Sequence, residues 1–381
     1  MLSDPSPRPA RCYDPSVAPY RDGEDSSVVH VHDYATIRAL LRDPLRVTAD
    51  VTESVSAADR DRLHPVSAFV WGTDRRTMSG CPGRHGALRT AMAPWFTASA
   101  AAARRATTRG AAEALAPAPG SAFDLYHDFA MPVVVASTAA WLGVEPADVE
   151  YAITDQLDQG EFFEHWPMLS TEEMDEHYRA LMARPELGGV AAEARALVAA
   201  GVVTEREAWG IVYSLSVSTV ATAAAVTLAA GLSVEQGTWE RVADPALADG
   251  AVQEAIRIGS PFPQASRFVR EPFAIGDVAV QPGDQVLMWL TAANRDLPGP
   301  HGQPLDRFDP ERDNGRQLGF GSGYHLCGGV HHVREVAVTA VTTLAERCPQ
   351  LRIVGPWKRF VGIDDGYVAA PAEAAAPQGA R

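Results

Sequence analysis

The loop from Phe320 to Gly329 carries the residue with the most evident chemistry, Cys327, among glycines at positions 321, 323, 328 and 329. These glycines permit sharp backbone turns or the close approach of a flat ligand. Apolar residues then recur at helical spacing from Val330, which places Cys327 at the start of a helix. The helix dipole and the unpaired backbone N–H groups at such a position favour a thiolate. A thiolate held in this way is a metal ligand or a nucleophile.

Three other interpretations of this loop remain open from the residues alone. Gly321 and Gly323 could belong to a dinucleotide-binding turn, but a third glycine is missing and no βαβ pattern follows. Cys327 could join His331 and His332 in a zinc site, although no second Cys/His cluster lies nearby in the sequence. A simple core cysteine is the third alternative.

The pattern Phe-x-x-Gly-x-His-x-Cys-x-Gly, from Phe320 to Gly329, closely resembles the haem-ligand loop of the cytochrome P-450 family. The resemblance implies that Cys327 is the axial ligand of a haem b iron and that Phe320 packs on the sulfur side. It also implies that Gly321 and His325 belong to the haem-binding loop. A thiolate ligand of this kind pushes electron density towards the opposite face of the iron and favours O–O cleavage.

A second motif opens a helix shortly after residue 81. His85 and Arg89 stand four residues apart and so share one helix face, which on its own could be an ordinary solvated surface. In the family that the chain resembles, a His-x-x-x-Arg pair binds the haem propionates, and Arg267 matches a further propionate-binding arginine. The resemblance therefore implies that His85, Arg89, Arg267 and His325 hold the propionates by charge-assisted hydrogen bonds.

A long apolar helix is predicted in the middle of the chain. Thr204 and Glu207 form a capping-box pattern, and the residues from Ala208 to Val234 include no charged residue and no proline. A helix this long and apolar must be buried. It resembles the central helix that passes over the haem in cytochromes P-450, where the signature is Ala-Gly-x-Asp/Glu-Thr.

This chain departs from that signature. One alignment places Ala221 and Thr222 at the acid–alcohol pair, and another places Ser218 and Thr219 there. In both alignments the alcohol is present and the acid is missing. We expect the proton supply to bound oxygen to be altered, because that step normally uses an acidic relay.

Glu254 and Arg257 lie one helical turn apart. An ion pair at this spacing is common on surfaces, where it contributes only tenths of a kcal/mol (about 0.2–0.5). Here it resembles the Glu-x-x-Arg motif of the family, which implies a structural ion pair behind the haem.

The expected substrate pocket combines residues from several segments. Aromatic residues mark a long loop before residue 80 and a cluster at 161–168, for which core packing is the alternative. The residues assigned to the pocket are Phe69, Trp71, Phe162, Phe163, Trp166, Val217, Pro263 and Gln264.

Composition limits the class of protein. The chain has 381 residues, of which 46% are hydrophobic, so it can bury a large core. Its net charge of −15 argues against a nucleic-acid partner, and its four dispersed cysteines form no disulfide framework. Neither a secretory leader nor a membrane span is expected from the sequence, which predicts a soluble cytoplasmic protein. The family resemblance implies a small-molecule substrate.

The resemblance extends over residues 27–368 and implies a mainly α fold, the cytochrome P-450 fold. This is a helical prism with a small β region and haem buried between the long central helix and the cysteine loop. Residues 1–26 are expected to form an N-terminal arm, and residues 369–381 a disordered tail.

Three functions are predicted, in descending order. The first is a monooxygenase that tailors a natural product with electrons from a ferredoxin/NAD(P)H system. The second is an atypical member that couples, cyclises or rearranges its substrate, or that uses peroxide or a nitrogen ligand. The third is a non-catalytic haem or ligand-binding protein. A ferredoxin-type donor is expected to dock on Arg84, His331, His332 and Arg334.

Overall fold

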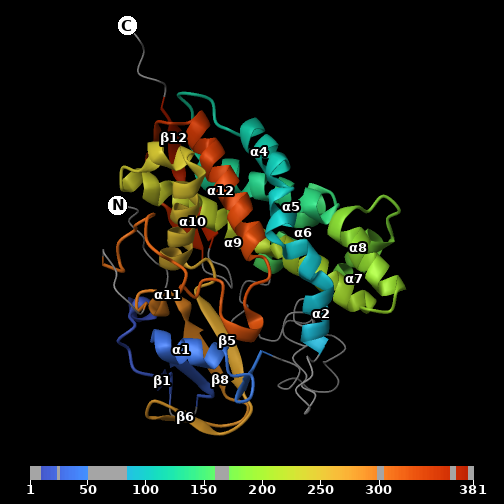
Figure 1. The fold of residues 1–381 in the computed structure, drawn as a ribbon, viewed down its shortest axis with the longest axis vertical. Helices are drawn as coiled ribbons and strands as arrows, with labels where there is room; N and C mark the ends of the chain where they lie inside the picture. The colour runs from blue at the N-terminus through green and yellow to red at the C-terminus, as the bar shows by residue number, and fades with distance from the viewer. Residues whose placement is uncertain are drawn as a thin grey trace.

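The computed structural model describes residues 10–23, 26–49, 84–158, 171–297, 304–360 and 366–375. A large helical part and a smaller β region lie one above the other, with α1, β1, β5, β6 and β8 gathered in the β region (Figure 1). This mainly helical architecture with a small β region agrees with the fold class predicted from the sequence.

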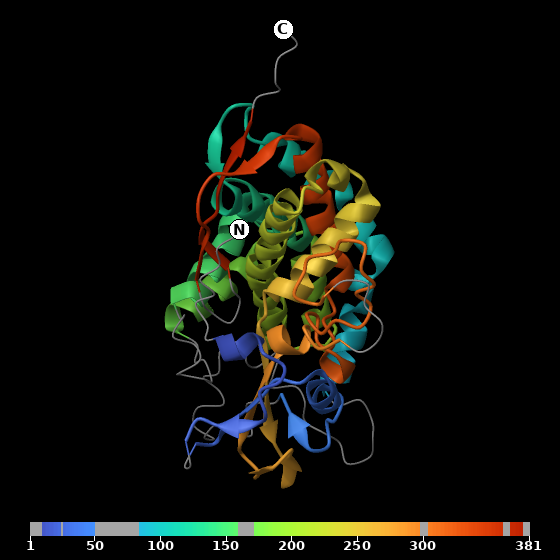
Figure 2. The ribbon, with the colours of Figure 1, turned by 90° about the vertical axis from the view of Figure 1, so that its left-hand side faces the viewer.

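Helix α9 (Glu205–Glu235) runs through the centre of the helical part (Figure 2). The predicted capping box is present, since the Thr204 hydroxyl accepts a hydrogen bond from the Glu207 N–H and the Glu207 carboxylate accepts one from the Thr204 N–H. Among the described elements, five α-helices pack along it: α5 (Met131–Leu142), α6 (Pro146–Asp158), α8 (Gly189–Ala199), α10 (Pro245–Gly259) and α12 (Val330–Arg347). The helix is therefore buried on several sides, as its apolar sequence predicts.

By length and composition α9 would also be able to cross a membrane, contrary to the expectation that no run approaches that length. Within its most apolar window, 67% is buried inside the molecule, which is typical of a core helix.

The β region is built on a five-stranded sheet with the order β1-β2-β8-β5-β3. Strands β2 and β8 are parallel, whereas the β1–β2, β8–β5 and β5–β3 pairs are antiparallel. The strands are β1 (Tyr20–Arg21), β2 (Val28–Val31), β3 (Val47–Thr48), β5 (Gln264–Val269) and β8 (Gln285–Trp289). Helix α1 (Tyr34–Leu41) covers this sheet and begins at Asp33, whose side chain accepts from the Thr36 N–H at 2.8 Å.

The following helices, strands and turns complete the elements that the structure describes. The helices are α2 (Arg84–Met92), α3 (Ala98–Ala102), α4 (Arg105–Ala114), α7 (Glu172–Ala183), α8 (Gly189–Ala199) and α11 (Leu290–Ala293). The other strands are β4 (Ala122–Asp124), β6 (Phe273–Ile275), β7 (Val278–Val280), β9 (Leu351–Ile353), β10 (Lys358–Phe360), β11 (Gly366–Ala369) and β12 (Pro371–Ala374). Short 3-10 or π turns span Ala10–Tyr13, Ala93–Phe96, Leu125–Ala130, Trp239–Ala243 and Gly323–His325.

The described part of the C-terminal segment is more ordered than the sequence analysis predicted. Strand β12 pairs with β4 and β9, and Ala372 and Ala374 are buried, so the prediction of disorder from residue 369 is wrong for residues 369–375. Burial alternates along this strand, as in a strand with one face on the core. Because the segment is rich in alanine, its sequence did not show that alternation. Within the N-terminal arm, β1 joins the main sheet. Residues 1–9 and 376–381 lie outside the described residues.

Candidate active site

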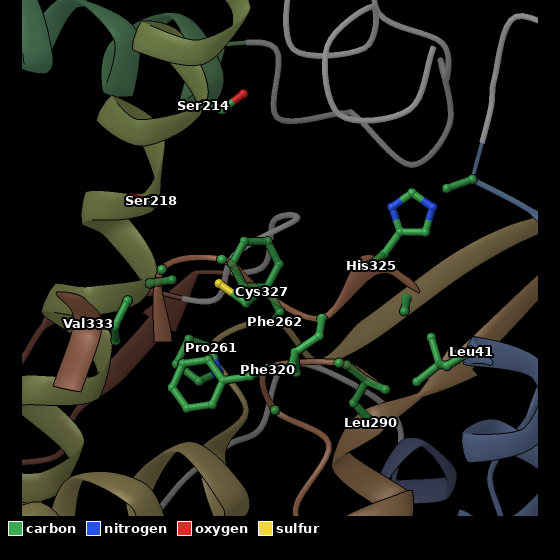
Figure 3. Close-up of a pocket in the computed structure, with 18 of the residues that line it drawn as sticks. Leu41, Ser214, Ser218, Pro261, Phe262, Leu290, Phe320, His325, Cys327 and Val333 are labelled. Carbon is green, nitrogen blue, oxygen red and sulfur yellow. The ribbon is translucent and has the colours of Figure 1, made fainter. Parts of the chain in front are cut away.

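A cavity of about 630 Å³ lies where the helical part meets the β region. Helix α9 forms one wall and the loop that carries Cys327 forms another, so that Ser218 and Cys327 flank the same space (Figure 3). Strands β5 and β8 and helix α2 complete the lining. Segments more than two hundred residues apart in the chain therefore meet at one site.

Backbone geometry directs the Cys327 loop into this cavity. Gly321 and Gly323 adopt left-handed backbone angles, with φ of 73° and 71°. At Gly323 a side chain would also meet the Leu41 carbonyl oxygen at 2.7 Å, so only glycine fits against the end of α1. The Cys327 N–H donates to the Phe320 carbonyl at 2.9 Å and closes the turn just before α12.

Cys327 is exposed and lines the cavity. Burial raises the pKa of this thiol, while the Gly329 N–H and the Arg89 guanidinium lower it. A cysteine that opens into a mostly apolar cavity beside a cation is suited to bind a soft metal centre as the thiolate.

Nitrogen-bearing side chains line the cavity next to this loop. The His85 ring lies 4.4 Å from the His325 ring, measured between centroids, and Arg89 donates to the Leu326 carbonyl at 2.8 Å. Arg267 approaches from β5 and is largely buried. All four residues predicted to bind the propionates therefore face one cavity, from three separate segments of the chain.

The cavity-facing side of α9 distinguishes the two proposed alignments. Ser218, Ala221 and Thr222 line the cavity, and the Thr222 hydroxyl donates to the Ser218 carbonyl at 3.0 Å. Thr219 does not line it, because its hydroxyl donates to Thr138 on α5 at 3.2 Å. The structure therefore brings Ala221 and Thr222 to the site and directs the Thr219 hydroxyl away from it. No carboxylate lines the cavity among the residues that the structure describes.

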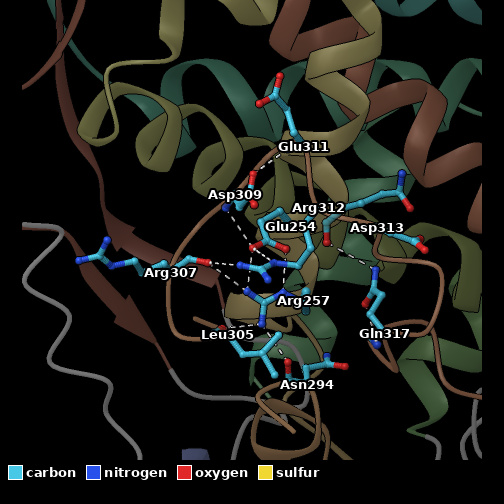
Figure 4. A network of polar contacts seen from close by, with 12 residues as sticks. Glu254, Arg257, Asn294, Leu305, Arg307, Asp309, Glu311, Arg312, Asp313 and Gln317 are labelled. Atoms are coloured by element: carbon cyan, nitrogen blue, oxygen red, sulfur yellow. Dashed lines mark hydrogen bonds and ion pairs between the residues drawn. The ribbon is translucent and has the colours of Figure 1, made fainter. Parts of the chain in front are cut away.

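Glu254 and Arg257 form a fully buried ion pair on α10, as expected, with both side chains 0% exposed (Figure 4). The Glu254 Oε2 accepts from Arg257 Nε at 2.7 Å. Its Oε1 accepts from Arg257 Nη2, from the Asp309 N–H and from Arg312 Nε, at 2.7, 3.0 and 3.1 Å. Arg312 is thus a third member of the network, which the sequence analysis did not assign to it.

Arg257 also secures the segments that lead to the cysteine loop. Its Nη1 donates to the carbonyls of Asn294 and Leu305, at 2.9 and 2.7 Å. Asn294 in turn accepts from the Leu318 N–H at 2.7 Å, two residues before Phe320. The network therefore stabilises the base of the loop and does not contact the cavity itself.

The predicted substrate-pocket residues fall into three groups. Gln264 lines the cavity, whereas Val217 and Pro263 do not. Phe69, Trp71, Phe162, Phe163 and Trp166 lie outside the described residues. The sequence analysis did not assign several residues that do line the cavity, namely Phe96, Trp141, Ser214, Phe262, Leu287 and Leu290. Ser214 had a usable signal, since it stands one helical turn before Ser218.

Of the four residues predicted to form the docking patch, one is buried and two form ion pairs within the molecule. His332 is only 4% exposed, because it packs against Trp141. Arg84 forms an ion pair with Glu207, with Nε 2.6 Å from Oε1, and Arg334 forms one with Asp249 at 2.7 Å. Both arginine charges are therefore partly neutralised within the molecule. His331 is exposed, as a docking residue must be.

The donor set supports only one of the metal sites considered for Cys327. Within the described ranges, no group of three or more His, Cys, Asp or Glu residues is arranged to hold a metal ion, which removes the support for a zinc site. A single thiol facing a large apolar cavity with cations at one side fits an apolar metal macrocycle that carries carboxylates. This lining and the fold therefore favour the class of haem-thiolate proteins.

Comparisons with known proteins lead to the same class. The family model for cytochrome P450 matches residues 232–331. The chain is 29% identical to the cytochrome P450 monooxygenase PikC of Streptomyces venezuelae, over 87% of this chain and 81% of that protein. It is 28% identical to the erythromycin C-12 hydroxylase of Saccharopolyspora erythraea, over 86% of this chain and 83% of that one.

The fold also matches solved structures. Mycobacterium smegmatis CYP164A2 with econazole bound superposes with a TM-score of 0.77 at 22% identity, over 93% of both chains. In sequence and fold this chain is therefore similar to cytochromes P450, which are oxidoreductases with a haem-iron cofactor.

Proposed function

We propose that this protein binds haem b through Cys327 and oxidises a small molecule in natural-product biosynthesis, using O₂ and electrons from a ferredoxin/NAD(P)H system. The convergence of Cys327, His85, Arg89, Arg267 and His325 on one cavity carries this proposal. The relatives support the substrate class, since one of them is named as a hydroxylase of erythromycin.

The side chains around the cavity have distinct tasks in this proposal. When bound, the haem supplies the activation of dioxygen and the oxidation of the substrate. Cys327 provides the axial thiolate, and His85, Arg89, Arg267 and His325 hold the propionates with charge-assisted hydrogen bonds. Phe320 and Gly321 belong to the lining next to the sulfur.

Helix α9 forms the cavity wall opposite the Cys327 loop. Among the described residues, its cavity-lining side chains include no acid that could donate a proton. Ala221 is a small residue on the cavity wall, and the Thr222 hydroxyl, which donates to the Ser218 carbonyl, can accept a hydrogen bond from water. A hydroxyl can orient water but does not release a proton readily at neutral pH. Protons therefore depend on Thr222, on ordered water or on the substrate.

A spectroscopic test decides the cofactor assignment. The purified protein should contain one haem b, and its reduced carbon monoxide complex should show the red-shifted Soret band of thiolate ligation. Cys327→Ala should abolish that band, whereas Cys348→Ala should retain it because Cys348 is buried away from the cavity. If Cys327→Ala kept the band, another residue would be the ligand and the proposal would fail.

A second candidate function rests on the residue at position 221. Alanine stands there on the cavity wall where the family signature has an acid. This favours an atypical reaction, such as coupling, cyclisation, rearrangement or use of peroxide or a nitrogen ligand. Products isolated from turnover with a surrogate redox pair distinguish it from hydroxylation, because only hydroxylation adds one oxygen atom from O₂. A haem spectrum without turnover would support a non-catalytic haem protein instead.

The electron donor and the cellular location complete the proposal. A ferredoxin-type protein would dock near the Cys327 loop, with His331 exposed there and Arg84 and Arg334 contributing partly neutralised charge. A cytoplasmic location is proposed as well, because the most apolar helix is mainly buried within the fold.

A further inference from the structure

His332 is a buried polar residue on the wall of the same cavity. It lies in the first turn of α12, five residues after Cys327, where the family that the sequence resembles usually has leucine. Its side chain is 4% exposed. Its buried Nδ1 has no hydrogen-bond partner in the part of the chain that the structure describes. An apolar residue would avoid that cost, so the imidazole needs another explanation.

Packing fixes the position of this ring. The Trp141 ring on α5 lies 4.0 Å from the His332 ring between centroids, at 33° between the planes. The Arg104 guanidinium lies 4.5 Å from the centroid of the same Trp141 ring, and Phe96 meets it edge-on at 5.6 Å. Phe96 also lies against Gly328 and Gly329, the two residues that follow Cys327. The ring is therefore held on the cysteine side of the cavity.

The same surroundings keep the imidazole neutral. Burial, together with the nearby charge of Arg104, lowers the pKa of His332 to about 3. A neutral imidazole has one N–H donor and one bare nitrogen acceptor. It therefore brings a directional hydrogen bond to the cavity wall without adding a charge.

We propose that His332 is a positioning residue of the haem-thiolate site, whose N–H polarises the cysteine side of the cofactor and raises its reduction potential. This inference rests on the haem ligation by Cys327 proposed above. A hydrogen-bond donor near a thiolate ligand stabilises negative charge on sulfur and weakens its donation to the metal. With a higher potential, the oxidised iron would be easier for an electron donor to reduce.

The test compares substitutions that separate the N–H from the ring. His332→Phe keeps a ring to stack on Trp141 but removes the donor, and His332→Gln keeps a donor without the ring. His331→Phe is the matched control, since His331 is the exposed neighbour. The measurements are the reduction potential from a spectroelectrochemical titration and the Fe–S stretching frequency from resonance Raman spectra.

We expect His332→Phe to shift the potential to more negative values and to raise the Fe–S frequency. His332→Gln should lie closer to the wild type, and His331→Phe should match it. A wild-type potential and frequency in His332→Phe would overturn the inference, as would an equal shift in the control. If His332→Phe does not retain haem, His332→Leu replaces it with the side chain common in the family and is judged by the same criteria.

These outcomes separate the two proposals. If Cys327 were not the ligand, either the wild type would lack the thiolate band or Cys327→Ala would keep it. If only the role of His332 were wrong, that band would be present and the potentials would coincide.

Discussion

Two regions of this molecule bury polar groups, and they differ in whether those groups have hydrogen-bond partners in the protein. Around Glu254 and Arg257 every contact comes from the chain itself, since both carboxylate oxygens and the guanidinium have protein partners within 3.1 Å. On the cavity wall, the Ser214 hydroxyl and the His332 Nδ1 are buried without a partner in the described ranges. The first region is typical of a structural network, in which the protein satisfies its own hydrogen bonds. The second is typical of a binding site, in which a ligand supplies the missing partners.

The difference separates residues that stabilise the fold from residues that await a cofactor or substrate. A satisfied network contributes to the free energy of unfolding whether or not the cofactor is present. Unsatisfied groups cost free energy in the empty protein, and this cost is recovered only on binding. Mutations in the first region should therefore change the free energy of unfolding, and mutations in the second should change cofactor binding or turnover.

The largest effect is expected from breaking the satisfied network. Glu254→Ala leaves Arg257 and Arg312 as buried charges, which should cost about 3–5 kcal/mol of unfolding free energy. The variant should be aggregated or poorly loaded with haem. The exposed ion pair between Arg241 and Glu311 is the control, and Glu311→Ala should change stability by no more than about 0.5 kcal/mol. A stable, fully loaded Glu254→Ala protein with only slowed turnover would contradict a structural role.

A buried histidine in the β region extends the comparison to pH. His32 is inaccessible and both its ring nitrogens are buried without partners in the described part of the chain, and burial together with His30 and Arg11 lowers its pKa to about 4. The unfolded chain therefore binds this proton more readily, so the stability is intact above pH 6.5 and falls as the pH drops towards 4. The loss should reach roughly 3 kcal/mol.

Denaturant unfolding at several pH values tests this prediction. His32→Phe should flatten the fall in unfolding free energy between pH 6.5 and 4, while the exposed His331→Gln should leave it unchanged. Parallel curves for His32→Phe and the wild type would show that His32 does not titrate as its burial requires.

A smaller effect is expected when a cofactor contact is removed from the cavity. Arg89→Ala should weaken haem retention by about 1–3 kcal/mol, the range for loss of a charge-assisted hydrogen bond. Haem transfer to apomyoglobin measures it, with Arg109→Ala as a control because that arginine pairs with Glu113 and Glu346 on the outside. Equal transfer rates for Arg89→Ala and the wild type would count against a propionate contact.

The smallest effect on stability, but an informative one, concerns α9. With simple substrates, most of the electrons from NADPH should form peroxide and little product. Ala221→Asp should change the amount of product formed per NADPH consumed, because it restores an acid at the cavity wall. Thr222→Ala should change this ratio as well, whereas Thr219→Ala should not, since the Thr219 hydroxyl faces Thr138. Ser218→Asp tests the other alignment. Tight coupling in the wild type that is insensitive to Ala221→Asp, Ser218→Asp and Thr222→Ala would refute unusual proton delivery.

Local patterns were sufficient for several features of this protein. The capping box at Thr204, the long α9 helix and the Glu254–Arg257 pair could be predicted because each is set by spacing within a few helical turns. The Cys327 loop was recognisable because its glycines are required by its own backbone angles. These features depend on residues close together in the chain.

Other features required the tertiary structure, because they depend on residues that the chain brings together over long distances. On a helix Thr219 and Thr222 lie about 60° apart, and Ser218 and Thr222 about 40° apart, so the sequence could not choose between the alignments. The hydrogen bond from Thr219 to Thr138 on α5 distinguishes them. In the same way, only the folded chain brought Arg312 to Glu254 and buried His332 against Trp141. The sequence by itself thus predicted the resemblance to the family, the candidate ligand Cys327 and the central helix, since these depend on local patterns. The tertiary structure decided which side chains face the cavity, because packing between distant segments selects one face of each helix.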